Sequence, residues 1–197
     1  MSQPRTHRLQ RKTSETDVEL TLTLDGQGNV DAQTGLAFLD HMVTALGKHA
    51  RFDLTLRCKG DLHVDDHHTV EDCALALGAA LDAALGDRKG IQRFGHAYAP
   101  LDEALARAVV DLSGRPGPYV DLGLRREKLG DVACENLGHF LRSLAVAARM
   151  TLHVDVLKGE NDHHRAEAAF KATALALRAA VARTLPADEV PSTKGVL

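Results

Sequence analysis

The sequence predicts a small protein of mixed α/β or α+β class in which one sheet-and-helix unit occurs twice. The first observation is a repeat: DHHTVEDCALALGAALDAAL at 66–85 aligns without a gap on DHHRAEAAFKATALALRAAV at 162–181. The second is that alternating apolar and polar runs, typical of half-buried strands, occur between Ala- and Leu-rich runs typical of helices. This alternation indicates a sandwich with a sheet on one side and helices on the other.

The first repeated element is a strand. ETDVELTLTLDGQG at 15–28 alternates from Val18 to Leu24 and ends at an Asp-Gly turn. EALARAVVDLSGRP at 103–116 matches it at an offset of 88 residues. The repeat therefore predicts an equivalent strand in the second half.

A helix and a further strand follow in each half. The helical segments FLDHMVTAL and NLGHFLRSL carry His41 and His139, 98 residues apart. The strand-like runs FDLTLRC at 52–58 and MTLHVDV at 150–156 come next.

The repeated helix of 66–85 and 162–181 closes each half. Asp66 and Asp162 precede its apolar periodicity and are predicted helix N-caps. Each half thus reads strand, strand, helix, strand, helix. The predicted boundaries of the duplication are about 8–90 and 91–185, within one domain of residues 1–197.

Composition excludes several classes of protein. Apolar residues make up 44% and charged residues 26%, as in ordinary globular proteins, and the net charge of −3 gives no basic field for nucleic acid. No apolar run reaches the roughly 20 residues of a membrane span, and the N-terminus lacks an apolar signal core. The expected location is the cytoplasm. Three cysteines without C-x-x-C spacing argue against disulfides or a thiolate zinc site and are expected to be buried thiols.

Histidine is frequent, with eleven residues, and its pattern predicts a pair of metal ions. His67 and Glu71 are four residues apart, so both project from one helix face and can bind one ion. His68 points about 100° further round the helix, so the adjacent histidines suit two ions better than one. The second copy repeats this spacing with His163, His164 and Glu167.

Duplication suggests how the ligands are shared. If the halves face each other across a pseudo-twofold axis, each repeated helix supplies one histidine and its glutamate to one ion and its other histidine to the second. The two sets would be His67 and Glu71 with His164, and His163 and Glu167 with His68, completed by His139 and His41. Three imidazoles and one carboxylate suit Mn, Fe, Co or Zn and leave positions open for water or substrate. The pattern leaves open whether the halves meet within one subunit or across an interface.

A single histidine on an apolar helix is more often a hydrogen-bonded core residue, and only the repetition favours metal binding. Four histidines outside paired motifs are therefore expected to be structural or surface residues: His7, His63, His96 and His153.

The chain resembles the imidazoleglycerol-phosphate dehydratase family. The motifs that carry the resemblance are FLDHM, DHHTVED, the RFG…PLDEAL…VDLSGRP block, NDHHRAEAAFKA and the terminal PSTKG. The resemblance implies an α+β fold of two tandem split β-α-β units, of the ribosomal protein S5 domain 2-like type. It also implies a lyase that dehydrates imidazole-glycerol phosphate to imidazole-acetol phosphate in histidine biosynthesis. Similar proteins bind two Mn²⁺ ions per active site and assemble as 24 identical subunits, with active sites at subunit interfaces. The implied metal ligands are His41, His67, His68, Glu71, His139, His163, His164 and Glu167.

The resemblance also suggests the substrate site. Glu15 resembles the family's substrate-side glutamate and is the expected catalytic acid/base. A C-terminal tail at 186–197 is expected to capture the phosphate together with two arginines. The expected substrate contacts, besides Glu15, are His49, Arg93, Arg115, Lys171, Ser192, Thr193 and Lys194. The hypothesis for catalysis is that metal charge favours an imidazolate form of the substrate, which expels the hydroxyl from the adjacent carbon.

Two other functions use the same residues. A dinuclear hydrolase would use the ions to activate water, although the phosphate-side motifs fit the dehydratase specifically. The third possibility is a non-catalytic shell protein whose subunits are held together by metal ions. Metal-dependent assembly without turnover of any imidazole substrate would identify it.

Overall fold

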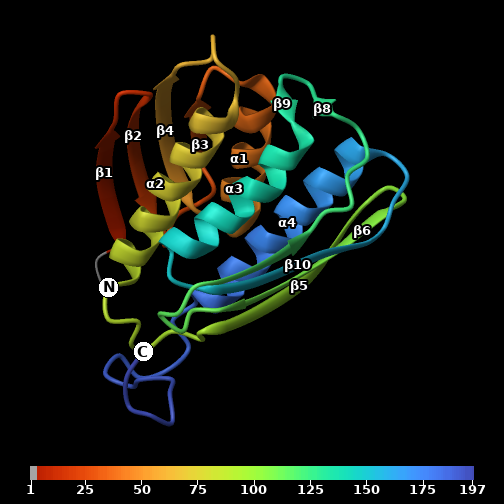
Figure 1. Ribbon diagram of the computed structural model, residues 1–197. Helices are drawn as coiled ribbons and strands as arrows, with labels where there is room; N and C mark the ends of the chain where they lie inside the picture. The colour runs from red at the N-terminus through yellow and green to blue at the C-terminus, as the bar shows by residue number, and fades with distance from the viewer. Residues whose placement is uncertain (1–3) are drawn as a thin grey trace.

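In the computed structural model, which describes residues 4–197, two four-stranded sheets enclose a layer of four helices (Figure 1). The first half comprises β1 (Thr6–Lys12), β2 (Thr16–Thr23), β3 (Val30–Gln33), α1 (Ala37–Ala50), β4 (Asp53–Gly60) and α2 (His67–Leu85). The second half comprises β5 (Phe94–Leu101), β6 (Ala104–Asp111), β7 (Gly117–Asp121), α3 (Cys134–Ala147), β10 (Thr151–Lys158) and α4 (Asp162–Ala180). A short hairpin of β8 (Lys128–Leu129) and β9 (Val132–Ala133) precedes α3.

The two halves have the same topology. The strand orders are β1-β2-β4-β3 and β5-β6-β10-β7, and in each sheet the last pair is parallel while the others are antiparallel. This arrangement confirms the predicted α+β class and its tandem repeated units.

The predicted number of strands was wrong. Each half has three strands before its first helix, because the short strands β3 and β7 were missed, and the β8–β9 hairpin was missed as well. β3 and β7 lie at sheet edges with four and five residues each, and neither carries an alternating apolar run. Their pairing with β4 and β10 therefore depends on a partner strand and not on a local pattern.

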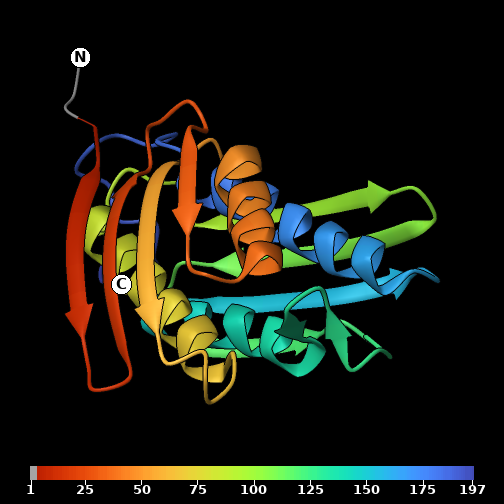
Figure 2. The same ribbon diagram turned by 90° about the horizontal axis from the view of Figure 1, so that it is seen from above.

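The helices pair across the two halves. α2 packs on α3, and α1 packs on α4, so each pair joins one helix from each repeat (Figure 2). Gly78 permits the first pairing, because a Cβ there would lie 2.6 Å from the Leu144 carbonyl oxygen. The close approach of α2 and α3 brings residues from both halves together at the helix ends.

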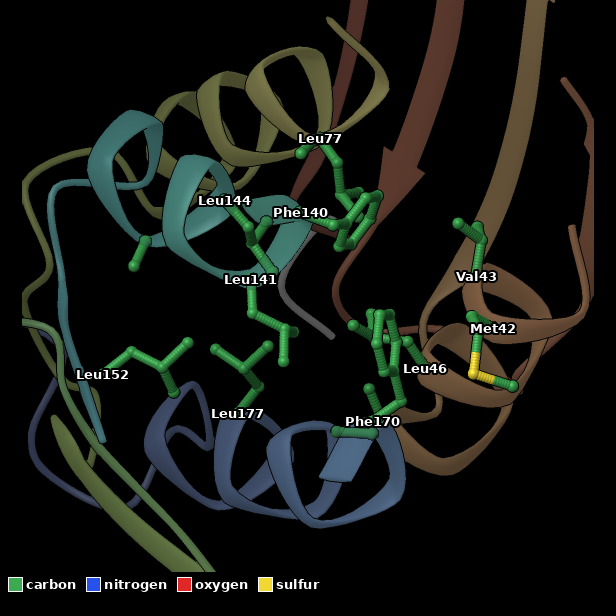
Figure 3. Packing of buried hydrophobic residues seen from close by; sticks show 14 of the residues in the cluster. Met42, Val43, Leu46, Leu77, Phe140, Leu141, Leu144, Leu152, Phe170 and Leu177 are labelled. Carbon is green, nitrogen blue, oxygen red and sulfur yellow. The ribbon is translucent and has the colours of Figure 1, made fainter. Parts of the chain in front are cut away.

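The core lies between these helix pairs. Phe140 of α3 and Phe170 of α4 are fully buried, with ring centroids 5.5 Å apart, and leucines from all four helices surround them (Figure 3). Apolar burial of this kind is the main stabilising term in a domain of this size.

Phe170→Ala is expected to lower the free energy of unfolding by about 3–5 kcal/mol, because it leaves a cavity between the two helix pairs. Chemical denaturation followed by circular dichroism measures this loss. Val146→Ala on α3 is the control, since that side chain is 46% exposed and its truncation removes little buried surface. Equal stability of the two variants would contradict a core centred on Phe170.

The predicted N-cap of α2 is in the right position, since Asp66 precedes His67, but the Asp66 side chain makes no capping bond. The predicted N-cap of α4 was wrong by one residue, because Asn161 and not Asp162 caps that helix. The Asp65 carboxylate accepts the His67 N–H at 2.8 Å, and Asn161 accepts the His163 N–H at 2.9 Å. Asp66 and Asp162 instead accept backbone N–H groups from the segment before α3. A tertiary partner thus displaces the local capping role.

The cysteine expectation holds, since Cys58, Cys73 and Cys134 are all free and buried. Among residues 4–197, no helix has both the length and the apolar character needed to cross a bilayer.

Candidate active site

Two clusters of metal-type ligands lie at the ends of the helix pairs. The first cluster is His67 and Glu71 from α2 with His139 from α3. The His139 Nε2 lies 3.3 Å from one Glu71 oxygen, and the His67 Nε2 lies 3.7 Å from the other. The two imidazole rings are stacked, with centroids 4.9 Å apart. Three ligand atoms therefore converge on one point from two helices.

The second cluster is its counterpart: His163 and Glu167 from α4 with His41 from α1. One Glu167 oxygen lies 3.0 Å from His41 Nε2 and 3.2 Å from His163 Nε2. The other Glu167 oxygen lies 2.6 Å from Lys171 Nζ. Burial opposes ionisation of Glu167, but Lys171 and His41 outweigh it and lower the pKa of Glu167 to about 2.

Each cluster combines one helix from each half. The structure thus brings together six of the eight predicted ligands, in two sets of three. Within each set the donor atoms lie within 4.8 Å of one another. Imidazole nitrogen and carboxylate oxygen, without thiolate, are suitable donors for Mn²⁺, Fe²⁺, Co²⁺ or Zn²⁺, so the residues present fit a divalent ion.

The remaining two predicted ligands, His68 and His164, join neither cluster within this chain. The His68 Nδ1 lies 3.0 Å from Asp61, and its Nε2 lies 3.7 Å from the expected acid/base Glu15. The His164 Nδ1 lies 2.7 Å from Glu103. In each case a carboxylate holds Nδ1, as is usual for a metal-binding histidine. The nearest carboxylate oxygens to Nε2 are further away, 3.7 Å at Glu15 for His68 and 3.8 Å at Asp102 for His164.

These hydrogen bonds shift the pKa values of both histidines and of Glu103. The hydrogen bond with Asp61 raises the pKa of His68, and the bond with Glu103 raises the pKa of His164. Three hydrogen bonds lower the pKa of Glu103 to about 2: the strongest comes from the Asn161 backbone N–H, followed by those from the His164 ring and the Glu160 backbone N–H. Glu103 is therefore an ionised acceptor at neutral pH.

Sequence reasoning missed three residues that orient the histidines: Asp61, Glu103 and Asn136. The repeat offered a signal for one of them, because Glu103 aligns with Glu15 at the offset of 88 residues. Asp61 and Asn136 had no such signal, since their roles depend on contacts with other segments.

His49 and Lys171 lie beside the second cluster, as expected from their positions next to ligand motifs. Lys171 pairs with Glu167, and burial followed by the nearby Lys171 charge lowers the pKa of His49. The lowered pKa favours the neutral form of His49, which borders this cluster together with Lys171.

The residues expected to bind phosphate lie near the far end of α4. The Arg93 backbone N–H bonds the Ala180 carbonyl at the end of α4, whereas His163 lies at its beginning. At 1.5 Å per residue these ends are about 25 Å apart. Figure 1 shows the C-terminal tail at that far end, opposite the first residues of α2 and α4.

Arg93 is already engaged by the protein. Its guanidinium bonds Asp111 at 2.7 Å and the Pro191 carbonyl at 2.7 Å, so it ties the tail to the second sheet. Arg115 is exposed, and Leu197 at the end of the tail packs against the neighbouring Gly114. Ser192 is half-buried, whereas Thr193 and Lys194 are exposed. The phosphate-side residues therefore form a group of their own, apart from both clusters.

Comparisons with known proteins agree with this arrangement. Residues 34–177 match the family model described as imidazoleglycerol-phosphate dehydratase. The chain is 53% identical to the imidazoleglycerol-phosphate dehydratase of Eremothecium gossypii over all of both chains. It is 57% identical to that of Kluyveromyces lactis, over 96% of this chain and 83% of that one.

Solved structures give the same result. The Staphylococcus aureus imidazoleglycerol-phosphate dehydratase superposes with a TM-score of 0.80 at 36% identity, covering 91% of this chain and 99% of that one. The Pyrococcus furiosus enzyme, solved in complex with (S)-C348, has a TM-score of 0.81 at 37% identity and covers 96% and 100%. The chain therefore belongs to the imidazoleglycerol-phosphate dehydratase family and is a hydro-lyase.

Proposed function

We propose that this enzyme dehydrates imidazole-glycerol phosphate to imidazole-acetol phosphate in histidine biosynthesis, with two Mn²⁺ ions in each active site. The observation that carries the proposal is the pair of equivalent His-His-Glu clusters. Two such sites suit a substrate with two ring nitrogens, because each nitrogen can meet one ion. Family membership identifies the reaction, and the donor set supports the metal.

Each active site is proposed to be shared between copies of the chain. His164 of another copy would complete the first cluster, and His68 of another copy the second, so that each ion has three imidazoles and one carboxylate. Two observations support sharing. The side chains of His67 and His163 are each 44% exposed, so neither cluster is enclosed by its own chain. The phosphate-side residues lie about 25 Å from the second cluster, further than one small substrate reaches.

A closed assembly of identical subunits, proposed to number 24, would provide such interfaces. The outer face of the second sheet supports self-association. Phe94, Tyr98, Val109 and Tyr119 are 40–60% exposed there, and Tyr119 stacks on His153. By contrast, strands β1 to β4, all within the described residues, expose no large apolar side chain. A duplicated fold with one polar and one aromatic face is expected to cover the aromatic one.

Tyr98→Lys with Tyr119→Lys is expected to reduce the mass of the assembly, because two buried ammonium groups oppose close packing. Light scattering after gel filtration measures the mass. Thr55→Lys on the exposed face of the first sheet is the matched control and should leave the mass unchanged. An undiminished mass for the double variant would place the assembly interfaces elsewhere.

The reaction removes a hydroxyl from the carbon next to the ring and a proton from the following carbon, and the resulting enol becomes the ketone. When bound at the ring nitrogens, the two ions would supply positive charge that favours the deprotonated ring. Glu15 would move the protons at the reacting carbons, since it lies beside His68 and would enter the shared site with it. Lys171 and His49 would contact the substrate beside the second cluster.

The tail is proposed to hold the phosphate through Ser192, Thr193 and Lys194, with Arg115 and with Arg93 positioning Pro191. Truncating residues 192–197 is therefore expected to raise KM by about 10- to 100-fold, the value of one or two charge-assisted hydrogen bonds. Steady-state kinetics measure KM, and bound metal measured in parallel should be unchanged. This truncation spares Pro191, so an unchanged KM would assign phosphate capture to other residues.

The test of the proposed function is turnover of imidazole-glycerol phosphate by metal-stripped protein, with and without Mn²⁺. Ketone formation restored by Mn²⁺, with two ions bound per chain, is the expected result. Release of inorganic phosphate without ketone would instead indicate a hydrolase. Two bound ions without any turnover would refute the dehydratase proposal.

A further inference from the structure

A buried relay of hydrogen bonds reaches one ligand of the first cluster. The Asn136 Oδ1 lies 3.1 Å from His67 Nδ1, and the Asn136 Nδ2 donates to Asp66 Oδ2 at 2.9 Å. The same Asp66 oxygen accepts the Ala133 N–H at 2.8 Å. Asn136 and Asp66 are only 4% and 6% exposed, so water does not replace these partners.

The chemistry of these groups determines the direction of the relay. Asp66 Oδ2 accepts from the Ala133 N–H and from the amide nitrogen of Asn136, so that nitrogen faces Asp66. The amide oxygen then faces His67 and can only accept. In its neutral form His67 therefore carries its proton on Nδ1, which leaves an unprotonated Nε2 directed at Glu71. Unprotonated Nε2 is the state that binds a metal ion.

The second cluster lacks this relay. The repeat places Phe38 where the other half has Asn136, and the Phe38 ring meets His163 edge-on, with centroids 5.2 Å apart. An aromatic ring offers no carbonyl oxygen to select the proton position. Asp162, the counterpart of Asp66, accepts the backbone N–H groups of Arg125 and Arg126 instead.

The residues four positions after the two cluster glutamates also favour a cation at the first cluster. Lys171 lies 2.6 Å from Glu167 in the second cluster, and its ammonium group repels an incoming cation. In the repeat, Leu75 occupies the equivalent place on α2, four residues after Glu71. In the first cluster, Asn136 thus orients the His67 imidazole, and Leu75 stands where the second cluster has Lys171.

We infer that Asn136, held by Asp66, is a positioning residue that makes the first cluster the tighter of the two metal sites, so that it fills first. The inference rests on the proposed metal function of the clusters. It assigns to a buried asparagine the difference between two sites that the duplication would otherwise make equal.

Calorimetric titration of the metal-stripped assembly with Mn²⁺ tests this assignment. Wild type is expected to bind two ions with distinct affinities. Asn136→Leu should weaken the tighter ion by about 10- to 100-fold, as loss of such a supporting contact typically does, and leave the other unchanged. His41→Ala, which disables the second cluster, should remove the weaker ion only.

Two variants separate orientation from folding. Asp66→Asn keeps an oxygen for the Ala133 N–H and therefore the amide direction, so it should retain the tighter ion. Asp65→Ala removes the carboxylate that accepts the His67 backbone N–H but does not contact the His67 imidazole. It should leave both Mn²⁺ affinities unchanged. If Asp65→Ala and Asn136→Leu lost equal affinity for the tighter ion, Asn136 would have only a structural role and the inference would be overturned.

Solid-state ¹⁵N spectra of histidine-labelled, metal-free protein give a readout independent of metal. The neutral His67 resonance is expected to show the Nδ1-protonated tautomer in wild type and a mixture in Asn136→Leu. A wild type that binds no divalent ion would overturn the metal proposal itself, whereas two ions of equal affinity, or an Nε2-protonated His67, would overturn only the role of Asn136.

Discussion

Replacing Glu15 by Gln is expected to lower kcat by about 10²- to 10⁴-fold, the range for losing general acid/base catalysis. Its carboxylate lies 3.7 Å from His68 and is 49% exposed at the turn between β1 and β2, so it is available to a substrate at an interface. Glutamine keeps the size of the side chain but cannot exchange a proton. Steady-state turnover with saturating Mn²⁺ measures the loss.

Two controls define the cause of that loss. Glu19→Gln changes an exposed carboxylate on the outer face of β2 and should leave kcat unchanged. Glu103→Gln affects the counterpart of Glu15 in the second half, which holds His164, and should weaken metal binding more than kcat at saturating metal. Full turnover by Glu15→Gln with two ions bound would assign the proton transfers to another group.

Mixing two inactive variants is expected to restore activity. Glu71→Ala removes a ligand of the first cluster, and His164→Ala removes the ligand that another copy would contribute to it. Each variant alone should be inactive, because every site lacks one ligand. In assemblies formed from equal amounts of both, about a quarter of the sites would combine an intact cluster with an intact His164, if subunits mix at random in a symmetric oligomer.

The control is a chain carrying both substitutions. Mixed with Glu71→Ala, it supplies no intact first cluster, so no activity should appear. Recovery in the first mixture and not in the second would assign the ligands to different subunits. No recovery in either mixture, with co-assembly verified by mass, would contradict sharing of His164 between copies.

Local patterns were sufficient for much of the fold. The alternation in β2, and the apolar periodicity of α2 and α4, depend on residues close together in the chain and therefore appear in the sequence. Strands β3 and β7 did not, because a short edge strand exists through pairing with its neighbour. The cap of α4 was misplaced by one residue, and Asp66 makes no capping bond, for a related reason: Asp66 and Asp162 instead accept backbone N–H groups of the segment before α3.

The sequence by itself determined the repeated unit and which residue types could bind metal. His67 with Glu71, and His163 with Glu167, share a helix face because the helical repeat places residues four apart side by side. The duplication also predicted that His139 and His41 complete these pairs. Only the tertiary structure decided that His68 and His164 join neither cluster within one chain, and that the tail lies far from both clusters. Those outcomes depend on how α2 packs on α3 and α1 on α4, and contacts between distant segments leave no periodic trace in the chain.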